Sequence, residues 1–182
     1  MKKLIILCSC LLILTGCNLG REMLNTPTKQ VELFLSKYQT LEEDVLKDLN
    51  KIVAEEELFN TNQREEYKKI IKKHYQNLTY KIKEEKIDGD AATVTTEIEV
   101  TDYSKILSAA ELYKTQNTNE FLNENGDFDT SKYTDYRLEK LKEAKETVTY
   151  TIDFTLTKKN KEWKLDPLSK EEEQKIHGTY VY

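Results

Sequence analysis

The stretch LTYKIKEEKIDGDAATVTTEIEV, residues 78–100, contains two runs in which apolar and polar side chains alternate. A period of two places every second side chain on the same face of a β-strand. Between the runs, Asp88-Gly89 is a strong short-range signal for a β-hairpin. We therefore predict two antiparallel strands, each with one buried face, whose inward positions are Leu78, Tyr80 and Ile82, then Ala92, Val94, Thr96, Ile98 and Val100.

A second pair of alternating runs lies closer to the C-terminus, on either side of the polar turn KKNKE, residues 158–162. Strands that are apolar on one face only are typical of an antiparallel sheet that helices cover on one side. The sequence thus predicts an antiparallel sheet of about four strands. The inward positions of the second pair are Val148, Tyr150, Ile152, Phe154 and Leu156, then Trp163 and Leu165.

Three amphipathic segments with the 3.6-residue period of helices precede the first strand. The first begins at Thr26-Pro27, because threonine suits the cap and proline suits the first helical position. The second begins with the capping-box sequence Thr40–Glu43, and the third begins after Asn62. Three helices before any strand indicate a helical layer that packs on the sheet.

Residues 104–145, between the two strand pairs, again show helical periodicity. A short final helix begins with the capping box Ser169–Glu172 and ends at Gly178, because glycine commonly terminates helices. The predicted fold class is α+β, with N-terminal helices packed on the sheet and a helical insert between two hairpins.

The N-terminal residues resemble the leader of a bacterial lipoprotein. Two lysines precede an apolar run, residues 4–14, that is too short for a membrane-spanning helix of about 20 residues. The next positions resemble a lipobox, and this resemblance implies cleavage before a cysteine that carries S-diacylglycerol, with an N-acyl group as an option. Two acyl chains form a stable anchor; an ordinary secretory signal with an incidental cysteine is the alternative. The lipobox residues are Leu14, Thr15, Gly16 and Cys17.

This leader defines the predicted organisation of the chain: a signal peptide (1–16), a lipidated cysteine and tether (17–25), and a single α+β domain (26–182). Lys and Arg number 28 against 33 Asp and Glu, a net charge of −5, which argues against nucleic acid as a partner. The exported domain has no cysteine, and hence no disulfide and no thiol for catalysis or metal binding. All three cysteines lie in the leader or at its end: Cys8, Cys10 and Cys17.

Three stretches of the chain resemble a family of uncharacterised, largely Gram-positive lipoproteins. The order of helices and hairpins also resembles the α+β cone of the nuclear-transport-factor-2-like (cystatin-like) superfamily, in which a curved sheet wraps a long helix and often leaves a pocket. The resemblance implies no catalytic residues, because the lipoprotein family brings none and the cone hosts enzymes, binders and scaffolds alike. The three stretches are TPTKQVELFLSKYQTLEEDVLKDL (26–49), DGDAATVTTEIEVTDYSK (88–105) and WKLDPLSKEEEQKIHGTY (163–180).

Candidate pocket residues are a histidine and three tyrosines on predicted apolar faces. For the histidine, His74, two interpretations remain open: a core-edge side chain bonded to a backbone carbonyl, or a polar group at the mouth of a pocket. The other histidine, His177, lies at a helix end, where a cation suits the helix dipole. Neither has a metal-ligand spacing, and we expect no metal, cofactor or catalytic site. The candidate pocket residues are His74, Tyr75, Tyr80 and Tyr150.

The segment NENGDFD, residues 123–129, is rich in oxygen atoms and invites comparison with a calcium loop. It does not fit one, because with its glycine at position six the first position is Phe121 and the twelfth is Lys132. We interpret it as a turn before the next helix.

The leading functional hypothesis is a lipoprotein on the extracytoplasmic face of the bacterial cell membrane, with a non-enzymatic domain that binds an envelope protein. A small apolar ligand in a cone pocket is the second hypothesis, and a cone-fold hydrolase or isomerase that uses His74 is the third. A filled sheet face favours the first and a roomy apolar cavity the second, whereas His74 paired with a carboxylate in that cavity favours the third.

Overall fold

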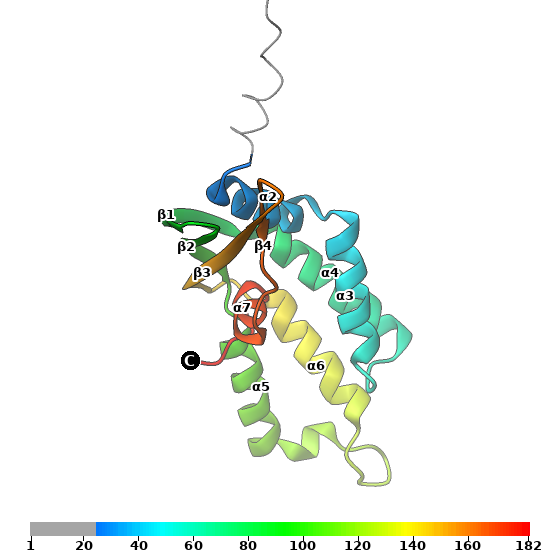
Figure 1. The fold of residues 1–182 in the computed structure, drawn as a ribbon. Coiled ribbons are helices and arrows are strands. Elements are labelled where there is room, and N and C mark those ends of the chain that lie inside the picture. The colour runs from blue at the N-terminus through cyan, green and yellow to red at the C-terminus, as the bar shows by residue number, and fades with distance from the viewer. Residues whose placement is uncertain (1–24) are drawn as a thin grey trace, which may run out of the picture.

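The computed structural model describes residues 25–182, so the predictions for the leader, the lipobox and nearly all of the tether lie outside the described residues. Within that range the chain is α+β, with six α-helices and a four-stranded antiparallel sheet (Figure 1). This confirms the predicted fold class. The helices are α2 (Pro27–Thr40), α3 (Glu43–Glu55), α4 (Thr61–Asn77), α5 (Tyr103–Gln116), α6 (Thr130–Glu143) and α7 (Lys170–Ile176), with a short 3₁₀ helix, η1 (Thr118–Phe121).

The sheet consists of β1 (Thr79–Asp88), β2 (Ala91–Thr101), β3 (Thr147–Lys159) and β4 (Glu162–Leu165), in that spatial order. All neighbouring strands are antiparallel. Both predicted hairpins form through two-residue turns. Gly89 has φ 60° in the first turn, and Asn160 and Lys161 have φ 54° and 67° in the second, as the primed hairpin turns require.

The predicted strand faces are also confirmed. Val94 pairs with Phe154 across β2 and β3, and both side chains are fully buried. The intervening side chains, Thr95, Glu97, Thr151 and Asp153, point away from the core. The inward side chains pack with α2 and α7 in one cluster, which we call the sheet cluster. A second cluster, the helix cluster, joins α3, α4, α5 and α6.

Local hydrogen bonding explains where the helices begin. Thr26 caps α2 by accepting a bond from the backbone N–H of Lys29, as predicted. The predicted start of α4 was wrong by two residues: Asn60, not Asn62, is the cap and forms a reciprocal capping box with Gln63. Asn60 is the cap because its pairing with a glutamine three residues later satisfies two backbone N–H donors.

The predicted capping box at Thr40–Glu43 is also wrong. The Thr40 hydroxyl donates to the carbonyl of Ser36 inside α2, so it is engaged before α3 begins. Leu41 then adopts φ 56° and closes α2 with a left-handed residue. Helix α3 starts after Glu42 without a side-chain cap, and its acidic first turn suits the helix dipole.

The helical insert leaves the sheet after β2 and returns at β3. Because Thr101 pairs with Thr147, the two ends of the insert lie side by side. The helices α5 and α6 therefore form a hairpin, which we call the helical hairpin, closed by residues 117–129. The closed end lies at the opposite end of the molecule from α2 (Figure 1). No described helix is both long and apolar enough to cross a membrane.

Candidate functional site

The four predicted pocket residues lie in three different places. His74 and Tyr75 are on α4 beside α7, Tyr80 is half-buried in β1 against the sheet cluster, and Tyr150 is on β3. Only Tyr75 lines one of the cavities described below, and the helix-facing side of the sheet is filled by the sheet cluster. The residues are thus not brought together as one pocket.

His74 is 2% exposed, and its Nε2 lies 2.9 Å from the carbonyl oxygen of Ile176. A carbonyl only accepts, so Nε2 carries the hydrogen and donates it. Burial lowers the pKa of His74 to about 4, although the Ile176 carbonyl opposes this shift. The ring also lies 4.9 Å from the ring of Tyr103. His74 is therefore a neutral histidine that holds α7, and no carboxylate within the described residues bonds to it.

His177 caps the C-terminus of α7, as predicted, but not as a cation. Burial, with His74 as a second cause, lowers the pKa of His177 to about 4. Its Nδ1 lies 2.9 Å from the hydroxyl of Tyr75. Both rings border a groove of about 240 Å³ that is also lined by Tyr38, Val45, Asp48, Lys51, Ile52, Glu55 and Glu173.

Tyr150 supports the C-terminal residues. Its hydroxyl donates to the carbonyl oxygen of Tyr180 at 3.1 Å, and the two rings pack edge to face at 5.7 Å. Tyr182 reaches back to the buried Asp102 and donates to its Oδ2 at 3.0 Å. These contacts are structural, because each of them tethers the last residues to the body of the fold.

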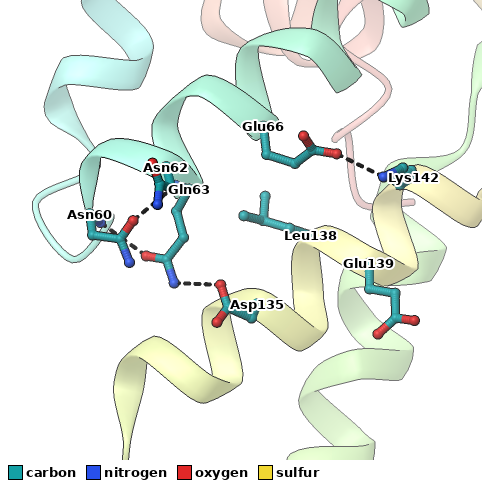
Figure 2. A pocket seen from close by; sticks show the side chains of 8 residues that line it. All are labelled: Asn60, Asn62, Gln63, Glu66, Asp135, Leu138, Glu139 and Lys142. Carbon is teal, nitrogen blue, oxygen red and sulfur yellow. Dashed lines mark hydrogen bonds and ion pairs between the residues drawn. The ribbon is translucent and has the colours of Figure 1, made fainter.

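A larger cleft of about 530 Å³ separates α4 from α6 (Figure 2). The Gln63 side chain, 3% exposed, bridges it by donating to Asp135 Oδ1 at 2.8 Å and to the Ser131 carbonyl at 3.0 Å. At the other end, Glu66 pairs with Lys142 at 3.0 Å. The lining is polar apart from one leucine, and it consists of Asn60, Asn62, Gln63, Glu66, Asp135, Leu138, Glu139 and Lys142.

The closed end of the helical hairpin carries an aromatic cluster. The rings of Tyr113 and Tyr136 stack 5.0 Å apart, and Phe121 packs edge to face on both Tyr133 and Tyr136. Phe128 lies 6.4 Å from Phe121 and is 43% exposed. The cluster thus has a packed interior and an accessible aromatic edge.

Charged side chains surround the rings of the aromatic cluster. Lys114 and Arg137 lie over the Tyr133 ring at 5.0 and 5.9 Å, and Lys140 lies over Tyr136 at 5.5 Å. The Tyr133 hydroxyl donates to Glu111 at 2.9 Å, and burial followed by this bond raises the pKa of Tyr133 to about 12. Aromatic side chains and arginine are enriched at protein interfaces, and cations are attracted to the faces of aromatic rings.

The loop next to this cluster is held by its own hydrogen bonds. Asn123 Oδ1 accepts from the backbone N–H groups of Asn125 and Asp127, and the Asn123 N–H donates to the Asp127 carbonyl. A bridge between Leu122 and Phe128 closes the loop. The predicted turn is therefore correct. Within residues 25–182, no cluster of three or more His, Cys, Asp or Glu side chains is arranged to hold a metal ion.

Comparison of the sequence with protein-family models finds no match, and comparison with curated proteins finds none either. Among solved structures, a Bacillus subtilis chain described as a "putative lipoprotein" (YcdA) aligns with a TM-score of 0.43 and 17% sequence identity. The alignment covers 68% of this chain and 39% of that chain, so this chain spans about two fifths of that length.

Proposed function

We propose that this chain is the interaction domain of a lipid-anchored protein on the extracytoplasmic face of the bacterial cell membrane. The helical hairpin would contact a protein partner. The observation that carries this proposal is the aromatic cluster at the closed end of the hairpin, where Phe128 remains 43% exposed although its neighbours are packed. Exposed aromatic edges on a rigid support are common anchors of protein interfaces.

The position of the hairpin supports the proposal. The described chain begins beside β4, where Asn25 Oδ1 accepts a hydrogen bond from the Trp163 backbone N–H at 2.6 Å. Helix α2 follows directly, and the closed end of the hairpin lies at the far end of the molecule (Figure 1). A chain anchored through Cys17 would then hold its aromatic cluster away from the membrane, where an envelope protein can reach it.

We also propose that the domain adopts the nuclear-transport-factor-2-like cone fold. It is supported by three N-terminal helices, two hairpins and an insert between them. In this chain the face that would line a cone pocket is occupied by side chains such as Val94, Ile98 and Phe154. That packing favours the interaction hypothesis over a small apolar ligand, and the carbonyl partner of His74 gives the hydrolase or isomerase hypothesis no acid–base pair.

Site-specific photocrosslinking tests the proposal. A photoreactive amino acid is placed at position 128 of the full chain in its native envelope, and separately at Ile87, an exposed apolar residue near the end of β1. We expect a discrete protein adduct from position 128 and none from position 87. A second comparison, Phe128→Ser against Ile87→Ser, should reduce recovery of the same partner only for the first variant.

Adducts of equal yield at both positions, or none at either, would contradict the hairpin contact. Recovery of a bound small molecule instead of a protein would point to the cleft between α4 and α6. Such a ligand would be polar, because Leu138 is the single apolar residue among those that line the cleft.

A further inference from the structure

The only two histidines of the chain, 103 positions apart in sequence, meet at the junction of α4 and α7. His74 bonds to Ile176 at the end of α7, and His177 bonds to Tyr75 on α4. These two contacts are the side-chain hydrogen bonds that join α4 to the last residues of the described chain. We call residues 169–182 the C-terminal strap.

If the His74 ring took up a second proton, on Nδ1, no hydrogen-bond acceptor would face that proton. Its Nε2 hydrogen is used by the Ile176 carbonyl, and its Nδ1 is buried without any hydrogen-bond partner. Protonation of Nδ1 would therefore create a buried charge and an unsatisfied N–H donor at the same time, which is costly. Release of the strap removes this cost, because the carbonyl leaves and water reaches the ring.

His177 differs from His74 in this respect. Its Nδ1 faces the Tyr75 hydroxyl, which can donate to a neutral ring or accept from a protonated one. Protonation of His177 thus reverses a hydrogen bond without breaking it. The two rings would nevertheless repel each other if both were charged, so His177 assists and His74 is the trigger.

The charged and titratable groups around the junction lie on α2, α3 and α7 and at the start of α5. Tyr38 on α2, Asp48, Lys51 and Glu55 on α3, and Glu173 on α7 line the groove beside His177. None of these carboxylates bonds to an imidazole. On the α5 side, the Tyr103 ring packs against the His74 ring at a tilt, and the buried carboxylate of Asp102 is already bonded to Ser104, Tyr182 and the Lys105 N–H. No described group is in place to neutralise a protonated His74.

The other strap contacts are few enough to be broken together. The strap contributes one fully buried side chain, Ile176, to the sheet cluster and none to the helix cluster. Its remaining bonds include the Ser104 N–H to the Gly178 carbonyl at 2.9 Å and the bonds of Tyr180 and Tyr182. The strap's ion pair, Lys175 with Glu171, is internal to α7. Apart from Ile176 and the partly buried Tyr180, the side chains of the sheet cluster lie outside the strap, and so do all those of the helix cluster.

We infer that the C-terminal strap is an acid-sensitive latch: uptake of a proton by His74, assisted by His177, detaches residues 169–182 from α4 while the rest of the domain stays folded. Detachment would open the groove between α3 and α7 and uncover Tyr75. The inference is independent of which partner the helical hairpin binds.

Peptide-resolved hydrogen exchange of the full chain, purified in detergent and corrected for intrinsic rates, tests the latch. Between about pH 7.5 and about pH 5, protection of residues 169–182 should fall by about 30-fold, the factor that linkage gives for a histidine shifted as far as His74. Protection of β2 should not change. His74→Gln keeps an N–H donor for the Ile176 carbonyl but cannot titrate, so its strap should stay protected. His177→Gln is the matched control and should still release.

Three results would overturn the latch. The strap and β2 could lose protection together, or the protection of the strap could be the same at pH 5 as at pH 7.5. In the third case, the strap of the His74→Gln variant could lose protection at the same pH as that of the unaltered chain. If His74→Gln does not fold, proton NMR of the two imidazole rings in the unaltered chain replaces it. Strap release must then coincide with protonation of His74, and release while His74 is still neutral refutes the inference.

Discussion

Phe154 and Thr151 show how a single β-strand separates core from solvent. Phe154 is fully buried in the sheet cluster, whereas the Thr151 side chain on the opposite face is exposed. Truncation of Phe154 to alanine should cost about 3–5 kcal/mol through lost burial and a cavity. Thr151→Ala should cost less than about 0.5 kcal/mol. Urea denaturation of both variants measures this, and equal losses would mean that the strand faces are assigned wrongly.

Gly178 occupies a position where any side chain would be strained. It has φ 69°, and a Cβ added there would lie 2.1 Å from the carbonyl oxygen of Thr101. Gly126 also has positive φ, 86°, but a Cβ there meets nothing within 4 Å. Gly126→Ala should therefore cost only the left-handed strain of about 1–2 kcal/mol. Gly178→Ala should cost about 1–3 kcal/mol more, because the added methyl group also overpacks the contact with Thr101. Thermal unfolding of the two variants measures the difference. Equal costs would mean that the close approach to Thr101 is absent.

At the scale of an element, α4 offers a test of which asparagine begins the helix. Asn60 accepts from the Gln63 N–H at 3.0 Å, whereas Asn62 is exposed inside the first turn. Asn60→Ala should lower the free energy of unfolding by about 1 kcal/mol. Asn62→Ala should change it by a few tenths at most, since alanine is a better helix former. Urea denaturation of the two variants is the measurement, and the reverse ranking would restore the start suggested by the sequence.

At the scale of the whole molecule, the two histidines should make stability fall with acid. Both have pKa values lowered from 6.5 to about 4 by burial. A group with a lowered histidine pKa leaves stability intact above the unfolded value of 6.5, and stability is lost as the pH falls from there toward 4. At about pH 5 the loss from His74 is about 2 kcal/mol relative to pH 7.5, limited by the free energy with which the strap docks. His177 adds less, because its hydrogen bond to Tyr75 can reverse on protonation.

Urea denaturation at the two pH values measures this loss. Ion-paired carboxylates such as Asp44, Glu66 and Glu111 have lowered pKa values, so they stay charged at pH 5 and do not contribute. The double variant His74→Gln/His177→Gln should show little change in stability between the two pH values. An unchanged pH dependence in the double variant would assign the effect to other groups.

The lipid anchor is also a property of the whole molecule. Cys17→Ser should leave the chain without lipid and uncleaved by the lipoprotein-specific peptidase, because that enzyme acts on the lipid-modified cysteine. Mass spectrometry of the mature N-terminus of the unaltered chain and of this variant is the measurement. An unmodified N-terminus elsewhere in the unaltered chain would refute the lipoprotein interpretation.

Local pattern was sufficient for the sheet, because the face of a strand depends only on alternation along the chain. Val94 and Phe154 could be placed inward, and both hairpins located, without knowledge of any distant contact. The helix starts predicted at Thr40 and Asn62 were wrong, since several polar residues near each start could serve as the cap. Hydrogen bonds to Ser36 and Gln63 select among them.

The candidate sites, unlike the strand faces, depend on contacts between residues that are far apart in the sequence. The cleft depends on a bond between Gln63 and Asp135, which are 72 positions apart, and the strap depends on His74 and Ile176, which are 102 apart. No periodicity relates such residues, so only the packing of α4 against α6 and α7 brings them together. The same packing removes water from His74 and His177 and makes both neutral, whereas sequence alone suggested a cation at His177. Burial, which a side chain acquires from distant neighbours, is the reason that the chemistry of these sites could not be predicted from local pattern.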